Sequence, residues 1–426
     1  MSASQHAPSW YAATARETTL RPPLRGAESA EACVLGAGFT GLSAALELAE
    51  AGHRVIVLEA ERVGWGASGR NGGQVIFGWS CGEAKLEKLV GHEDARRLFD
   101  WSREGVRLIR ERIARHAIDC DWRNGHAHVA IKPRHVEELK AWRQTLAERY
   151  DHPLEWWDRE RLGEVLASPR YLGALFDPDS GHLHPLNYAL GLARAAEAAG
   201  VRIFEGSQVT RLEPGARVQL HTAEGVVRCD FAVLAGNALV RGIAPSLDRK
   251  IMPVGTYIGA TATLGEETAR SLIGNDMAVA DINWALDYFR PSADHRLLFG
   301  GRASYSNLPP PDLRGVMRRR MRRVFPQLAD ADFEFLWGGV IDISRNRAPH
   351  WGRLHDNVYF AQGFSGHGVA AAGLAGRVIA EAIGGQSGRL DVFAKIRHGD
   401  FPGGRLLRTP ILVAAMAWYK LRDALW

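Results

Sequence analysis

Three glycines near the start of the chain have the spacing of a dinucleotide-binding turn. Gly36, Gly38 and Gly41 form the pattern G-x-G-x-x-G directly after an apolar run that includes Val34 and Leu35. In such a turn the first glycine allows the tight bend, the second lets the backbone approach a pyrophosphate, and the third lets a helix pack closely on the sheet. The helix that follows would direct its N–H groups and positive dipole end at the phosphates. We therefore predict dinucleotide binding here, with a glycine turn that holds no ligand as the alternative.

An acidic residue at the end of the next strand supports this interpretation. Residues 54–58, RVIVL, are almost continuously apolar, as expected of a parallel strand that is covered on both faces. Glu59 follows directly, about 20 positions after the glycine turn, where a carboxylate accepts hydrogen bonds from the ribose hydroxyls of an adenosine. A 2′-phosphate would be repelled, so NADP is disfavoured. The strand, the turn, a helix over about 41–51, the stop at Gly52 and the second strand make one mononucleotide-binding unit.

A second glycine-rich segment lies just downstream. Residues 64–74, GWGASGRNGGQ, contain too much glycine and too few helix formers to be an ordinary crossover, so their backbone must come close to another group. On this segment the sequence resembles the D-amino acid oxidase (DAO) superfamily of FAD-dependent amine oxidoreductases, and most closely its γ-glutamylputrescine oxidase-like branch. The resemblance covers nearly the whole chain and is specific at three places, residues 33–74, 337–349 and 358–381.

The resemblance implies a set of cofactor-binding residues. Residues 64–74 would follow the diphosphate toward the isoalloxazine ring, and Val209 would contact the adenine through its backbone. The strand 231–237 would end beside the nucleotide, with an ordinary strand-to-loop turn as the alternative. The helix after residues 363–368, GFSGHG, would face the N1/C2=O edge of the flavin and stabilise its reduced anion; a plain glycine turn is the alternative. The predicted residues are Gly36, Gly38, Phe39, Thr40, Gly41, Glu59, Ala60, Gly66, Ala67, Ser68, Arg70, Asn71, Gly72, Gly73, Gln74, Val209, Ala235, Gly236, Gly363, Gly366, His367, Gly368 and Val369.

The activity that the resemblance implies is oxidation of a primary or secondary amine, with a γ-glutamylated polyamine as one candidate substrate. The flavin takes a hydride onto N5 from the carbon next to nitrogen, and water hydrolyses the resulting imine. The amine must arrive neutral, which a desolvated or aromatic pocket favours. We expect Arg302 and His367 to take part, Arg302 as a carboxylate anchor, although a salt bridge and a helix start are the respective alternatives. The predicted substrate residues, for which core packing is the alternative, are Tyr257, Trp284, Tyr288, Arg302, Trp337 and Phe364.

Two departures from relatives limit the interpretation. Sarcosine oxidases of this superfamily attach FAD through a cysteine, and residues 337–349 contain none, so we predict non-covalent FAD. They also carry a lysine beside the flavin that activates oxygen, and the strand 297–302 has none. O2 and another electron acceptor therefore both remain open. An amino acid dehydrogenase of the same superfamily and a non-catalytic flavin-binding subunit of a larger oxidase are the alternative functions.

These groups must be positioned by two kinds of sheet. Residues 251–335 show the longer polar and apolar alternation of antiparallel strands, unlike the buried runs around the glycine turn. We predict a two-domain α/β fold of the glutathione reductase and DAO type, in which a Rossmann-like FAD-binding domain carries an antiparallel-sheet substrate domain. The predicted parts are an extended arm over 1–29, an FAD-binding domain over 30–99, 177–250 and 336–385, a substrate domain over 100–176 and 251–335, and a tail with an apolar helix over 386–426.

Composition excludes several other classes of protein. The 426 residues are 46% hydrophobic and 24% charged, which is ordinary for a globular protein, and the net charge is +5. The cysteines lack any metal or disulfide spacing, which fits a reducing cytoplasm. No apolar run is long enough to span a membrane, and the first 30 residues lack the core of a signal peptide, so we expect a cytoplasmic protein. The sequence does not indicate a subunit count. The four cysteines are Cys33, Cys81, Cys120 and Cys229.

Three further segments have both a simple and a functional interpretation. His182 and His184 stand two apart but lack a carboxylate or cysteine partner at useful spacing, so a domain-crossing loop is favoured over a metal site. The run 317–324, MRRRMRRV, lacks the aromatic residues of a nucleic-acid site and predicts a solvated helix face. The apolar residues 411–421 would dock on the body, with a membrane surface or a second subunit as alternatives.

Overall fold

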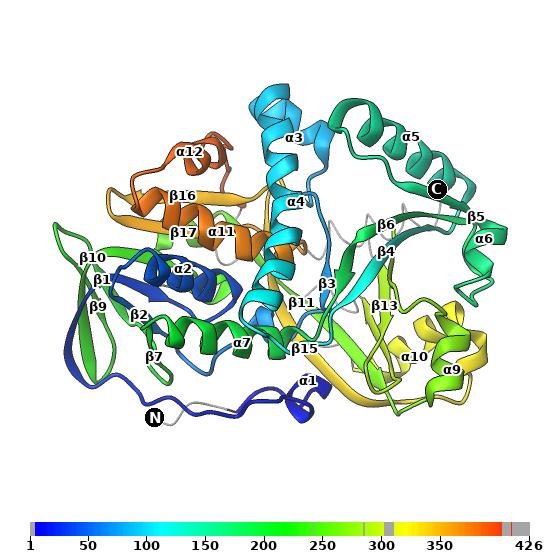
Figure 1. The fold of residues 1–426 in the computed structure, drawn as a ribbon, viewed down its shortest axis with the longest axis horizontal. Coiled ribbons are helices and arrows are strands. Elements are labelled where there is room, and N and C mark those ends of the chain that lie inside the picture. The colour runs from blue at the N-terminus through cyan, green and yellow to red at the C-terminus, as the bar shows by residue number, and fades with distance from the viewer. Residues whose placement is uncertain (1–4, 241, 284–285, 302–310, 403–409, 411–426) are drawn as a thin grey trace.

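Two β-sheets organise the chain (Figure 1). The computed structural model describes residues 5–402 except 241, 284–285 and 302–310, together with residue 410. One sheet is largely parallel and is covered by helices, while the other is largely antiparallel. This arrangement confirms the predicted α/β fold class.

The first sheet has the central strand order β16-β17-β10-β1-β2-β7. Strand β1 pairs in parallel with β10 on one side and β2 on the other, so that Leu35 is opposite both Leu234 and Leu58. The carboxyl ends of these strands therefore meet at one edge, which is where open α/β sheets bind ligands. The strands are β1 (Gly26–Leu35), β2 (Val55–Leu58), β7 (Arg202–Phe204), β8 (Arg211–Glu213), β9 (Val218–His221), β10 (Gly225–Leu234), β16 (His350–His355) and β17 (Val358–Gln362).

Helices pack against this sheet through small residues. A Cβ on Gly376 of α11 would lie 2.5 Å from the Ala44 nitrogen of α2, so these two helices require a glycine at their contact. Helix α2 begins two residues earlier than predicted, because the Gly38 carbonyl already accepts the Leu42 N–H. On α4, Arg112 donates to Ser43 and Glu47 of α2. The helices are α2 (Phe39–Glu50), α3 (Glu83–Val90), α4 (His92–Arg115), α7 (Pro185–Ala198), α8 (Pro245–Asp248), α11 (Gly368–Ile383) and α12 (Gly388–Ala394).

The second sheet has the order β15-β11-β14-β13-β12-β4-β6-β3. Its pairs are antiparallel except β12 with β4. One face packs on a separate core in which the rings of Phe289 and Phe299 stack 6.0 Å apart. The strands are β3 (Gln74–Val75), β4 (Arg123–Ala130), β5 (Glu155–Asp158), β6 (Gly173–His182), β11 (Ile251–Thr261), β12 (Ala278–Asp281), β13 (Asp287–Pro291), β14 (Leu297–Gly301) and β15 (Phe333–Ser344).

Four further helices accompany this sheet: α5 (Pro133–Tyr150), α6 (Arg159–Gly163), α9 (Glu266–Leu272) and α10 (Leu313–Val324). Helix α10 contains the arginine run and buries Met317 and Met321. Its Arg319 is exposed, whereas Arg320 forms an ion pair with the buried Asp287, so only part of the run is a solvated face. Strand β15 crosses the predicted boundary at residue 336, and the domain boundaries stay a prediction.

The N-terminal arm contains a helical turn, α1 (Trp10–Ala13), and both of its aromatic side chains are buried. Trp10 Nε1 donates to Asp294 at 3.1 Å, and the Tyr11 ring packs edge-on against the rings of His184 and Trp337. Figure 1 shows the arm along the lower edge of the view, reaching from the first sheet toward the second. The arm therefore contacts the start of α7 and strand β15 of the second sheet.

In the part of the chain that the structure describes, no single helix is long and apolar enough to cross a membrane. The pair α11 and α12 together has the length and apolar composition of a membrane span, but the two helices are bent by 119° relative to each other. The four cysteines are free. The apolar segment 411–421 lies outside the described residues.

Candidate active site

The glycines that open α2 and α11 line one cavity of about 370 Å³. Gly38 lies at the start of α2 and Gly366 two residues before α11, although 328 positions separate them in the sequence. The cavity is at the carboxyl ends of β1, β2 and β10, and its far wall includes residues 340–342 of β15. One elongated ligand can therefore contact both helix starts.

The first end of the cavity is built by the glycine turn. The Phe39 N–H donates to Ser68 Oγ at 2.9 Å, and a Cβ on Gly38 would lie 2.8 Å from the same oxygen. Gly36 has a φ of +103°, and a Cβ on Gly41 would lie inside the van der Waals surface of the Gly36 carbonyl oxygen. Backbone leaves no room for a side chain at Gly36 and Gly41, and at Gly38 a side chain would displace the Ser68 hydroxyl that caps the Phe39 N–H.

Glu59 is the carboxylate at this end. Its oxygens accept N–H groups from Ala37 at 2.7 Å and Glu61 at 2.9 Å. Burial, with a smaller contribution from the nearby Glu205 and Glu61 carboxylates, raises its pKa to about 7 even though these two N–H donors lower it. This carboxyl group is therefore partly protonated near neutral pH, and its ionised form is the stronger acceptor for hydroxyl donors.

Asp342 lies at the other end of the cavity, where it binds the turn that precedes α11. Its carboxylate accepts the N–H groups of Gly363 and, at 3.2 Å, Phe364, while its backbone oxygen accepts that of Ser365 at 3.0 Å. Gly363, Ser365 and Gly366 all have left-handed backbone, with φ of +80°, +54° and +97°. Burial raises the Asp342 pKa to about 6. Sequence reasoning missed this residue; its only local signal is a lone acid in the apolar strand WGGVIDIS.

The second sheet clamps the glycine-rich segment 64–74. Trp337 Nε1 donates to the Arg70 carbonyl at 3.0 Å, and Arg290 Nε donates to the Gly72 carbonyl at 2.7 Å. A Cβ on Gly72 would lie 2.6 Å from the Tyr288 ring. Tyr288 and Trp337 were predicted to line the substrate pocket, and in the structure they pack on the predicted flavin loop.

Arg290 is a buried cation whose five N–H groups all meet neutral acceptors. Besides Gly72, its guanidinium donates to the carbonyls of Leu183 and Pro291, the Tyr11 hydroxyl and His182 Nδ1. It is 2% exposed, and no carboxylate among the described residues pairs with it. Sequence reasoning missed Arg290, because most of its partners come from three distant segments, at Tyr11, Gly72 and residues 182–183.

The predicted cofactor residues divide into two groups. Those that line the cavity are Gly36, Gly38, Phe39, Thr40, Glu59, Ala60, Gly66, Ala67, Ser68, Asn71, Val209, Ala235, Gly236, Gly366, Gly368 and Val369. Those that do not are Gly41, Arg70, Gly72, Gly73, Gln74, Gly363 and His367.

The predicted substrate residues are more dispersed. Phe364 lines the cavity, while Tyr257 is 7% exposed on β11, beside Gly338. Trp284 and Arg302 lie outside the described residues. Sequence reasoning also missed an apolar part of the wall, formed by Leu35, Leu58, Leu239, Val340 and Ile341.

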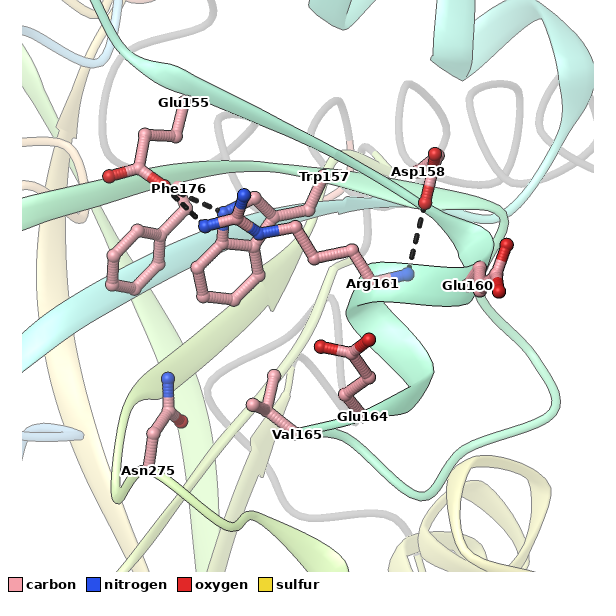
Figure 2. Close-up of a pocket in the computed structure, with 9 residues that line it drawn as sticks. All are labelled: Glu155, Trp157, Asp158, Glu160, Arg161, Glu164, Val165, Phe176 and Asn275. Atoms are coloured by element: carbon pink, nitrogen blue, oxygen red, sulfur yellow. Dashed lines mark hydrogen bonds and ion pairs between the residues drawn. The ribbon is translucent and has the colours of Figure 1, made fainter.

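A second, open cavity of about 660 Å³ lies on the outer side of β5 and α6. Figure 2 shows Arg161 extended over Trp157 and bound to Glu155, with Phe176 stacked on Trp157 at 4.1 Å. None of the predicted cofactor or substrate residues that the structure describes lines it. We place the active site at the smaller cavity, because the glycine turn, the buried carboxylates and both helix starts meet there.

No three His, Cys, Asp or Glu side chains among the described residues are grouped so as to hold a metal ion. His182 Nε2 bonds the Asp276 carbonyl at 2.6 Å, and His184 Nδ1 accepts the Asn187 N–H at the start of α7. Both histidines therefore have structural partners.

This chain belongs to the DAO family of FAD-dependent oxidoreductases, whose family model matches residues 31–382. It is 43% identical to the probable oxidoreductase OrdL of Haemophilus influenzae over 425 residues, 98% of each chain. It is 41% identical to the gamma-glutamylputrescine oxidoreductase of Escherichia coli over 423 residues, 99% of each chain. The fold is similar to that of glycine oxidase from Geobacillus kaustophilus, with a TM-score of 0.72 at 18% identity, covering 87% of this chain and 100% of that one.

The predicted cofactor and enzyme class are thereby confirmed: the chain is an oxidoreductase that uses FAD. The geometry of the cavity also fits this cofactor. The glycine turn at α2 excludes side chains where a pyrophosphate needs close backbone, and Glu59 supplies acceptors for a ribose.

Glu59 gives a testable pH dependence. We expect the affinity of the apoprotein for FAD to rise as pH increases through about 7, because the ionised carboxylate accepts ribose hydroxyls more strongly. Burial raises the folded pKa above the usual 4.5, so the stability that the protonated Glu59 contributes to the apoprotein is fully present below pH 4.5 and is lost as the pH rises from there to about 7. Fluorescence titration with FAD at several pH values measures the effect.

Glu59→Gln should bind FAD about tenfold more weakly, with a flatter pH profile. Glu224→Gln, which changes an exposed carboxylate away from the cavity, is the control and should match the wild type. A wild-type affinity that stays constant through this pH range would contradict the assigned role.

Proposed function

We propose that this chain oxidises a primary or secondary amine, and that its substrate is γ-glutamylputrescine or a closely related polyamine derivative. The observation that carries the proposal is the 41% identity to the gamma-glutamylputrescine oxidoreductase of Escherichia coli along 99% of both chains. The bound FAD would accept the hydride, and the imine would then be hydrolysed by water.

The surroundings of the cavity support this chemistry. The start of α11 directs N–H groups toward the cavity, and Asp342 holds the preceding turn in its left-handed conformation. Nearby histidines are uncharged at neutral pH, since burial lowers the pKa of both His182 and His367 to about 3. A desolvated site favours the neutral amine over the ammonium ion. Hydride loss needs that neutral form, because it leaves the nitrogen lone pair available.

The experiment is anaerobic reduction of the purified holoprotein by a panel of amines, followed by the loss of visible flavin absorbance. We expect γ-glutamylputrescine to bleach the flavin fastest, and free putrescine, which lacks the γ-glutamyl group, to bleach it far more slowly. Bleaching by amino acids alone would contradict the proposal and favour an amino acid dehydrogenase with Arg302 as carboxylate anchor. A flavin that no amine reduces would indicate the non-catalytic subunit.

Two further measurements use the same sample. Acid precipitation should release the FAD into solution, as expected for non-covalent attachment. Readmitting air after bleaching shows whether O2 restores the colour rapidly, which separates an oxidase from a dehydrogenase that requires another acceptor.

A further inference from the structure

Two histidines lie on the same face of β4. His126 and His128 are two residues apart, so their side chains share one side of the strand, while Ala127 and Val129 face the separate core on the other side. Their rings meet edge-on at 4.5 Å, and the His128 ring packs edge-on against Trp142 of α5 at 5.2 Å. His126 is fully buried, although it is not part of any apolar cluster.

The hydrogen bonds of Gln74 assign the tautomer of His126. Gln74 Nε2 donates to the Val279 carbonyl at 3.1 Å, so the amide oxygen is the atom that faces His126 Nε2, at 3.4 Å. That oxygen can only accept, and Nε2 must therefore carry the hydrogen. In neutral imidazole the other nitrogen, Nδ1, is then a bare acceptor.

This acceptor has no partner in the described part of the chain. His126 Nδ1 is buried without a hydrogen bond, and so is Nδ1 of His367. Nearly all buried polar atoms in native proteins are satisfied by protein, ordered water or a ligand, so an unpaired acceptor close to the residues of the cofactor cavity has room for a donor from outside the chain.

His367 links this face of β4 to the cofactor cavity. It is the residue before α11, and its neighbours Gly366 and Gly368 both line the cavity. The charge of His367 lowers the pKa of His126, and that of His128 lowers the pKa of His367, so the three groups act on one another electrostatically; His182 and Arg347 also act on this group of histidines. Burial lowers the pKa of His128 to about 4 and that of His367 to about 3, so these rings are acceptors rather than acids at neutral pH.

We propose that His126 Nδ1, with the ring of His367 beside it, accepts a hydrogen bond from an N–H of the amine substrate. This inference rests on the proposed function and adds the group that recognises the substrate nitrogen. Gln74, the last residue of the glycine-rich loop, fixes the tautomer and thereby couples the flavin loop to substrate binding. The site accepts primary and secondary amines, and it discriminates against neutral tertiary amines because they have no N–H.

Two substitutions of His126 distinguish the roles of its two ring nitrogens. In His126→Asn the side-chain amide reaches the position of Nδ1 and can still present an acceptor. In His126→Gln the amide reaches the position of Nε2, which preserves the contact with Gln74 but removes the acceptor. Calorimetric titration of γ-glutamylputrescine into dithionite-reduced holoprotein measures binding without turnover. We expect the dissociation constant to rise at least about tenfold in His126→Gln and to stay within about threefold of wild type in His126→Asn.

The control is His135→Gln, because His135 is a buried histidine of α5 whose Nδ1 accepts the Ile131 N–H. It should bind the amine as the wild type does, and the flavin absorption spectrum should be unchanged in all three variants. Unaltered amine affinity in His126→Gln overturns the inference while leaving the proposed function intact. Failure of every amine to bleach the wild-type flavin removes the proposed function, and the inference with it.

If His126→Gln does not fold, the substrate can be varied instead. Methylating the reacting nitrogen of γ-glutamylputrescine once retains an N–H in the neutral amine, whereas methylating it twice removes the last one. We expect the single methyl to be tolerated and the second to weaken binding to reduced wild-type protein at least about tenfold. Equal binding of the two analogues overturns the inference.

Discussion

Replacement of Gly41 by alanine is expected to abolish FAD binding and to leave little folded protein. The added Cβ would enter the carbonyl oxygen of Gly36 and would lie 3.1 Å from Val34 Cγ1. The carbonyl cannot move away, because the Gly36 N–H is held by the Leu58 carbonyl at 2.8 Å and β1 is paired on both sides. Overpacking against flexible side chains costs about 1–3 kcal/mol, and a clash with fixed backbone costs more.

That loss is a large part of the roughly 5–15 kcal/mol by which a domain is stable. The measurements are flavin content per chain and the thermal unfolding temperature. Gly388→Ala is the control, since a Cβ there meets nothing within 4 Å and the residue does not have a positive φ. It should equal the wild type in both measurements, whereas a Gly41→Ala protein with full flavin content would show that the turn is looser than this structure.

Replacing Arg290 by methionine should have the second-largest effect. Methionine fills similar space but removes all five donors and leaves the buried carbonyls of Gly72, Leu183 and Pro291 without this partner. Each buried acceptor left unsatisfied costs on the order of 1–3 kcal/mol. We expect a lower unfolding temperature and much weaker FAD binding, because the Gly72 carbonyl belongs to the glycine-rich loop.

Arg290→Lys helps to distinguish charge from geometry. Lysine retains the positive charge but not the planar fork, so its unfolding temperature and FAD affinity should fall between those of the wild type and Arg290→Met. Arg25→Met, at an exposed position, is the control and should be neutral. Wild-type FAD affinity in Arg290→Met would contradict a role for Arg290 in holding the loop.

Sequence reasoning predicted the parts of the site whose residues lie close together in the chain. The glycine turn and Glu59 fall within 24 residues, and Glu59 accepts the Ala37 N–H across only 22 positions. Each glycine requirement follows from local backbone geometry, so the residue types alone carry the signal. The fold class followed in the same way, from buried apolar runs in one part of the chain and alternating patterns in another.

The missed residues act across long separations. Arg290 meets Gly72 across 218 positions and Trp337 meets Arg70 across 267, and no periodicity links such partners. Tyr288 and Trp337 were recognised as important aromatics, but aromatic character does not distinguish a ring that faces substrate from one that covers a glycine loop. His126 became a candidate only when the structure placed Gln74 beside it.

The buried aromatic arm has a consequence for the order of folding. Trp10 and Tyr11 leave the ribosome before their partners Asp294 and Arg290, which follow 284 and 279 positions later. The arm therefore stays exposed to solvent until these partners have been synthesised, and it docks late in folding. Nascent chains halted before Arg290 should thus present an accessible N-terminal segment to chaperones and proteases, and synthesis past Asp294 and Trp337 should end that exposure.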